Sequence, residues 1–356
     1  MNHLLFRCCK PLSAWGFYFL SIFVSINAYS IPTLNILNWD DYLSEEAIIG
    51  WERQMGAKVQ VIAYDNEDIR DLLLTDLTQN HIDLAVVDSP SAMKLAKLGY
   101  VETLKETVHS SSIEPNWLHR CGDNGVPYLW GTLGIAYRED KIDQPIHAWA
   151  DLFSEREDLK GHIGMLGDYY SMTAPALIHL NLSPNTAEEM DLKAAFELLK
   201  KQTESVLTYE YAPSFLVNSS NRDNLYAAVV YSGDQFLMND TTGKEVWRYV
   251  LPDEPSLVWL DCWVVPINSE KKSLALSFIE YIGQANVAAI NSEEVGVATV
   301  SLAARSLQSK EMTEDELIYP RKESFDKLLS VEMLSDTNIR QRIRMQEAIK
   351  VIHESK

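Results

Sequence analysis

Basic residues are scarce in this chain of 356 residues, which has 31 lysines and arginines against 51 acidic residues and a net charge of −20. A chain with this balance cannot neutralise a phosphate backbone, so nucleic-acid binding through phosphate contacts is excluded. The excess of carboxylates is instead compatible with cationic ligands. The sequence also lacks glycine-rich phosphate loops, internal repeats and low-complexity segments.

Cysteine is scarce as well, with four residues, two of which lie in the first ten positions. None of them follows a lipobox-like pattern, so we expect no lipid anchor. Export would permit a disulfide between the other two, Cys121 and Cys262. Because Cys262 lies in an apolar run and Cys121 in a polar loop segment, free thiols are favoured, although the sequence leaves pairing open.

Long apolar runs are missing after residue 24, so no later segment has the length of a membrane-spanning helix. Near the start, Arg7 and Lys10 precede an apolar core over residues 12–24, and the small residues at 28–30 suit cleavage near Ile31. We therefore predict a cleaved signal peptide over residues 1–30 and an exported, soluble protein. Uncleaved anchoring is the alternative.

The rest of the chain exceeds what one core normally supports, which predicts two lobes. Apolar strands over 34–39, 58–64 and 82–87 alternate with amphipathic helices over 44–56 and 68–79. This strand–helix order predicts an α/β fold with a parallel sheet, and ligands of such sheets bind beyond the carboxyl ends of the strands.

A second strand–helix pattern follows, with strands over 162–166 and 225–231. We expect the chain to cross between lobes near 133–137 and near Trp259. The predicted lobe I covers residues 31–137 plus 260–303, and the predicted lobe II covers residues 138–259 plus 304–356.

The run 256–266 reads as a buried strand that contains one charged residue, Asp261. Trp259 lies two residues earlier, so both side chains share a face of the strand. A carboxylate beside an indole suits an ammonium group, which would gain a charged hydrogen bond and a cation–π contact. The alternative is an aspartate that pairs with a lysine or arginine of its own chain or caps a helix.

Other acidic and aromatic residues follow the predicted strands, where a ligand would bind. They are Trp39, Asp40, Tyr42 and Asp88 in the first lobe and Asp168, Tyr231 and Asp234 in the second. Each aspartate could instead cap the helix that follows it, and the rings could pack between lobes. We expect Tyr128 and Trp130 to pack near the hinge rather than against a ligand.

Seven short motifs carry a resemblance to a known family: NWDDY (38–42), DL (83–84), PYLWG (127–131), WADL (149–152), YSGD (231–234), WLD (259–261) and LAAR (302–305). In this order and spacing, over residues 34–320, the chain resembles the periplasmic spermidine/putrescine-binding proteins of bacterial polyamine uptake systems. The resemblance implies a two-lobed periplasmic binding protein fold, a type II-like clamp with hinge crossings. It also implies a monomeric binding protein that is not an enzyme and holds no cofactor or metal.

Carried over by position, the resemblance makes Trp39, Tyr42, Asp168, Trp259 and Asp261 ligand contacts. It makes Tyr231 an aromatic wall where spermidine binders usually have Trp. Asp234 matches an acid that putrescine-binding relatives use.

Five positions depart from the family pattern. Asp40 replaces a small hydroxyl residue, Asp88 replaces Ser, Ser171 replaces Glu, and Pro90 and Val297 replace Tyr. The first lobe gains acids and the second loses one, so the preferred polyamine stays open among putrescine, spermidine and norspermidine.

The resemblance leaves two purposes open. The closed clamp would dock on a membrane permease for ABC-type uptake, or on a membrane receptor that controls cyclic-di-GMP and biofilm formation; the altered groove favours the sensor. Two other hypotheses compete. The run 168–170 suggests tyrosines that hold ferric iron, and Asp40 and Asp41 suggest a glycosidase pair.

Overall fold

The computed structural model describes residues 31–64, 67–75, 81–104 and 112–356. The predicted signal peptide and residues 76–79 of the second predicted helix lie outside these ranges. Within them, no helix is both long enough and apolar enough to cross a membrane.

The first half of the sheet is a parallel α/β unit, as its alternating sequence pattern predicts. β1 lies between β2 and β3 and pairs with both in parallel. The strands are β1 (Thr33–Trp39), β2 (Lys58–Tyr64) and β3 (Leu84–Asp88), and the helices that follow them are α1 (Glu45–Met55), α2 (Glu67–Thr75) and α3 (Ser89–Lys97). The carboxyl ends of the three parallel strands therefore meet at one edge of the sheet, where the candidate site lies.

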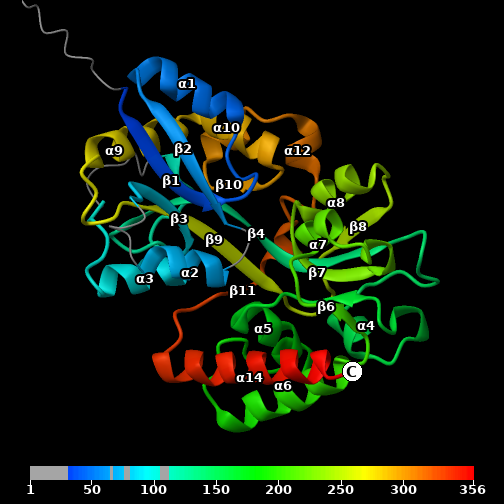
Figure 1. Cartoon of the computed structure of the whole chain (residues 1–356). Helices are drawn as coiled ribbons and strands as arrows, with labels where there is room; N and C mark the ends of the chain where they lie inside the picture. Colours follow the sequence, from blue (N-terminus) through cyan, green and yellow to red (C-terminus); the bar gives the residue numbers. More distant parts are fainter. Residues whose placement is uncertain (1–30, 65–66, 76–80, 105–111) are drawn as a thin grey trace, which may run out of the picture. The chain divides into compact units, whose positions relative to one another are not determined.

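Two long antiparallel strands join this half to the second, β4 (Gly125–Arg138) and β9 (Leu257–Val264). β9 pairs with β3 and with the first part of β4. At Leu133, β4 changes partner and pairs with β7 and β8 instead. Figure 1 shows both strands running from one half of the molecule to the other. The change of partner falls where the chain was expected to cross.

The second half repeats the parallel arrangement, with β5 between β6 and β7. Its strands are β5 (Ile163–Gly164), β6 (Val206–Thr208), β7 (Ala227–Tyr231) and β8 (Trp247–Val250). Its helices are α4 (Trp149–Phe153), α5 (Tyr169–His179), α6 (Glu189–Gln202), α7 (Ala212–Asn218), α8 (Asp234–Thr242) and α14 (Asp336–Glu354), with 3₁₀ helices at Glu157–Leu159 and Arg222–Asn224. The C-terminal α14 packs on α5 and α6 (Figure 1).

The remaining elements lie between β9 and α14. They are α9 (Lys272–Ile282), α10 (Ala285–Val295), β10 (Ala298–Thr299), α11 (Leu302–Arg305), α12 (Lys310–Glu314), α13 (Lys322–Phe325) and β11 (Leu329–Ser330). Ile318 and Tyr319 are buried in the core of the first half, together with Leu37 and Trp130. Part of the predicted lobe II thus packs on the first half, and the lobe boundaries stay a prediction.

Cys121 and Cys262 form a disulfide with a Cα–Cα distance of 5.9 Å, so the expectation of free thiols was wrong. The polar sequence around Cys121 was misleading, because its side chain is fully buried. The pairing of β4 with β9 places Pro127 opposite Cys262 and brings the turn before β4 against the same strand.

Candidate ligand-binding site

The candidate residues gather where strands of both halves end. Asp88 ends β3 and lies opposite Asp261 in the antiparallel pair of β3 with β9. Trp39 ends β1, and Tyr42 lies in the loop before α1. Tyr231 ends β7 in the second half. The sheet topology therefore brings together side chains that are up to about two hundred residues apart in sequence.

Three half-buried rings form a continuous aromatic wall between the halves. The ring centroid of Trp259 lies 6.5 Å from that of Tyr42 and 6.0 Å from that of Tyr231. Trp39 stands at the first-half end, with its ring centroid 4.4 Å from that of Tyr64. The faces of these aromatic rings can pack against the methylene groups of a ligand and can bind cations.

Asp261 is the buried acid of this wall, with 5 % of its surface exposed. It forms no salt bridge with any described residue, although the sequence allowed an internal pair. Burial raises its pKa to about 7, and the charge of Asp88 adds to the rise, while Tyr42, Arg70 and Trp39 oppose it. A carboxyl with this environment gains most from a cation that enters from outside.

Asp88 differs from Asp261 because its negative charge is already neutralised by a basic residue of the protein. Its carboxylate forms an ion pair with Arg70, whose side chain is 3 % exposed. It also caps α3, accepting hydrogen bonds from the Ser91 amide at 2.8 Å and the Ser91 hydroxyl at 2.7 Å. The capping alternative therefore describes Asp88, which still lines the cavity described below.

In the second half, Asp168 caps α5. Its Oδ1 accepts from the amides of Tyr170 at 3.0 Å and Ser171 at 2.7 Å, and burial raises its pKa. The hydroxyl of Ser171 lies 3.2 Å from that of Tyr231, which links Asp168 to the aromatic wall.

Asp234 is buried, and both of its oxygens have partners in the chain. Oδ2 accepts from the Tyr231 amide at 2.8 Å, and Oδ1 accepts from the Tyr211 hydroxyl. Burial raises its pKa to about 7. Asp234 therefore contacts the Tyr231 backbone and, unlike Tyr231, does not line the cavity described below. Asp40 is exposed at the end of β1, outside the buried group.

A cavity of about 270 Å³ opens beside these residues, between the two halves. Candidate residues that line it are Asp88, Tyr231 and Trp259, together with the departures Pro90 and Ser171. Glu332, from the segment between β11 and α14, adds a carboxylate that sequence reasoning left out. Glu332 lies beyond residues 34–320, over which the family resemblance runs, so only its acidic side chain could have indicated it.

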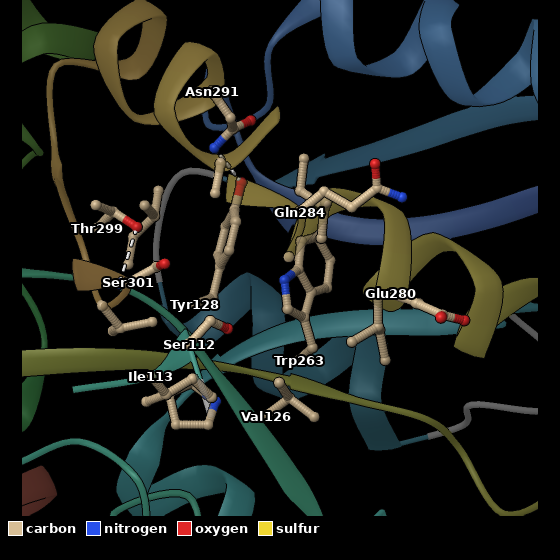
Figure 2. Close-up of a pocket in the computed structure, with 17 residues that line it drawn as sticks. Ser112, Ile113, Val126, Tyr128, Trp263, Glu280, Gln284, Asn291, Thr299 and Ser301 are labelled. Atoms are coloured by element: carbon tan, nitrogen blue, oxygen red, sulfur yellow. Dashed lines mark hydrogen bonds between the residues drawn. The ribbon is translucent and has the colours of Figure 1, made fainter. Parts of the chain in front are cut away.

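A second cavity, of about 180 Å³, lies between the sheet and the helices α9 and α10 (Figure 2). Tyr128 and Trp263 line it, and none of the predicted ligand contacts does. The tyrosines proposed for ferric iron are not both available, because the Tyr170 hydroxyl donates to Asn185 Oδ1 at 2.6 Å.

Comparison with known proteins identifies the family. Residues 51–320 match the family of bacterial extracellular solute-binding proteins. The chain belongs to this family. The prediction of a binding protein rather than an enzyme is therefore confirmed, and the glycosidase hypothesis falls.

Among relatives of this solute-binding protein, a norspermidine sensor of Vibrio cholerae is 32% identical over 324 residues, 91% of this chain and 90% of the sensor. The spermidine/putrescine-binding periplasmic protein of Escherichia coli is 27% identical, over 82% of this chain and 84% of its own. A solved structure of a putative spermidine/putrescine ABC transporter from Listeria monocytogenes superposes with a TM-score of 0.79 at 25% identity, covering 89% of this chain and 98% of its own. The two-lobed fold is confirmed.

Proposed function

We propose that this solute-binding protein is periplasmic and binds a linear polyamine, with Asp261 as the main partner of an ammonium group. The observation that carries the proposal is a carboxyl buried beside Trp259 and Tyr42 without a salt bridge in the described part of the chain. A bound ammonium group would neutralise that carboxylate and contact the ring faces.

The remaining residues suit the rest of such a ligand. Tyr231 and Trp259 offer ring surface to methylene groups along the cavity wall. Glu332 supplies a carboxylate to the cavity, where it would meet a further ammonium group, and Asp168 holds Ser171, which also lines the cavity. Asp234 holds the Tyr231 backbone, so we assign it a supporting position.

We further propose that binding serves sensing, through a membrane receptor, rather than uptake through a permease. Similarity to a norspermidine sensor covers 91% of the chain at 32% identity, against 27% for the spermidine/putrescine-binding protein of Escherichia coli. A triamine of the norspermidine type is then the expected ligand. ABC-type uptake is the second candidate, supported by the relatives that bind spermidine and putrescine.

Calorimetric titration of the purified mature protein with norspermidine, spermidine and putrescine tests the proposal. We expect saturable binding, tightest for norspermidine, and a melting temperature that rises with ligand concentration. A neutral sugar and a dicarboxylate serve as negative controls. Absence of both heat and thermal stabilisation with all three amines would refute polyamine binding. Tight binding of putrescine alone would refute the triamine preference.

A further inference from the structure

The loop between β1 and α1 places two rings of the candidate site, Trp39 and Tyr42. It contains a left-handed residue other than glycine, Asp41, with φ +50°. Such a conformation costs free energy and persists only where surrounding contacts hold it. Within the loop, Asn38 contributes, because its Oδ1 accepts from the Trp39 amide at 2.9 Å and its Nδ2 lies 3.4 Å from the Tyr42 carbonyl.

Stronger support comes from two residues that lie far away in sequence, one on β4 and one on α10. The Tyr128 hydroxyl donates to the Tyr42 carbonyl at 3.0 Å, and Asn291 Nδ2 donates to the Tyr128 oxygen at 2.8 Å. Asn291 Oδ1 accepts from the Ser44 amide at 2.9 Å. Asn291 is 1 % exposed and Tyr128 is 7 % exposed. Figure 2 shows Asn291 on α10 directed at the Tyr128 hydroxyl.

The backbone groups at the two ends of this series of hydrogen bonds determine which atom donates in each bond. The Tyr42 carbonyl can only accept, so the Tyr128 hydroxyl must donate its one proton there. The Tyr128 oxygen then accepts from the Asn291 amide nitrogen, which leaves the amide oxygen for the Ser44 N–H. Burial raises the pKa of Tyr128, so its hydroxyl keeps the proton that it donates. Since both ends are backbone groups of one loop, the bonds hold the loop at two points.

We propose that Tyr128 and Asn291 are positioning residues of the ligand site, which set Tyr42 against Asp261 and Trp259. This inference rests on the proposed polyamine binding. Both residues line the cavity of about 180 Å³ rather than the cavity of about 270 Å³, so they act through the loop. The Tyr128 ring also packs edge-on against Tyr42, with centroids 5.8 Å apart.

Tyr128→Phe tests the inference, because it removes the donor to Tyr42 and keeps the ring. Tyr319→Phe is the matched control. Tyr319 is a buried tyrosine of the same half whose hydroxyl also accepts one bond, from the Thr299 amide, and donates one, to Gln308. We expect both variants to lower the melting temperature. Only Tyr128→Phe should weaken norspermidine binding in calorimetry, by about tenfold, as the loss of one buried hydrogen bond allows.

Two further measurements separate positioning from general destabilisation. Asn291→Leu should weaken binding similarly, and the double variant should be no worse than about the larger single effect, since both residues act on one loop. The pH midpoint of binding should also move upward in Tyr128→Phe. The groups that face Asp261 are Asp88, Arg70, Trp39 and Tyr42, and a displaced Tyr42 hydroxyl no longer lowers the pKa of that carboxyl.

Equal affinities of wild type, Tyr128→Phe and Tyr319→Phe would overturn the inference, as would equal losses in the two variants. Failure of the proposed function would look different, because the wild-type protein itself would then show no binding of any polyamine.

Discussion

Asp261→Asn should have opposite effects on stability and binding, because its carboxyl is buried without a salt bridge in the part of the chain that is described. Asparagine keeps the shape and can still form hydrogen bonds, but it removes the charge. Replacement of a residue that stabilises the fold should lower the free energy of unfolding. A residue kept for a ligand imposes a cost on the empty protein, so its replacement should stabilise that protein.

The pKa of Asp261 gives the size and the pH range of this effect. Its value is about 7 in the folded protein against an ordinary value of 3.8, which is about three tenfold steps in proton affinity and roughly 4 kcal/mol. The folded state holds the proton more tightly than the unfolded state. The wild-type protein therefore loses stability as pH rises from about 4 through about 7. Asp261→Asn should match wild type near pH 4 and exceed it by up to about 4 kcal/mol at pH 8.

Urea unfolding of ligand-free wild type and Asp261→Asn at pH 4.5, 6 and 8 measures the difference, and calorimetry measures norspermidine binding. Loss of the charged partner should weaken binding by about 2–5 kcal/mol, roughly 30-fold to several thousand-fold. Asp88→Asn is the control, because it removes the charged partner of the buried Arg70, although asparagine can still cap α3, and it should destabilise the protein by about 1–3 kcal/mol at pH 8. An Asp261→Asn protein that is less stable than wild type at pH 8 would refute the reasoning.

Three other outcomes follow from the same structure. Wild-type affinity for norspermidine should rise about tenfold between pH 6 and pH 8 as Asp261 ionises, and a flat calorimetric profile would contradict this. Gly233→Ala should weaken binding and lower the melting temperature, because Gly233 has φ +103° and an added Cβ would lie 2.8 Å from the Gly296 carbonyl oxygen; unchanged values would contradict the steric argument. Reduction of the Cys121–Cys262 disulfide should cost about 2–5 kcal/mol in urea unfolding, and equal midpoints with and without reductant would show that the crosslink carries no stability.

The strands and the line of aromatic residues could be predicted from sequence because their patterns are local. Apolar runs bounded by turns gave β1, β2 and β3 nearly at their observed positions, and they placed Trp39 and Tyr231 at strand ends, as observed. The resemblance supplied the two-lobed fold. These inferences needed only side-chain periodicity and motif order.

The partners of the buried acids could not be predicted, because they depend on contacts across long separations in sequence. The sequence around Asp88 does not indicate that Arg70 is its ion-pair partner. The sequence around Asp234 likewise does not indicate that it accepts a hydrogen bond from Tyr211. The disulfide was missed for the same reason, since a polar stretch around Cys121 hides a buried side chain. Glu332 was left out because it lies beyond residues 34–320, over which the family resemblance runs.

The acids of the candidate site differ in which groups of the protein neutralise or hydrogen-bond their charge, and the proposed functions rest on that difference. Asp88 is neutralised by Arg70, and both oxygens of Asp234 accept hydrogen bonds from the chain, so the fold benefits from each. Asp261 is as deeply buried as Asp234, yet it faces the rings of Tyr42 and Trp39 and a second acid, and it forms no salt bridge within the described part of the chain. A fold gains nothing from such a carboxylate in the empty state. Under the proposed function, the free energy that this carboxylate costs is recovered when the ammonium group binds, which would tie ligand affinity to the positions of Tyr42 and Trp259.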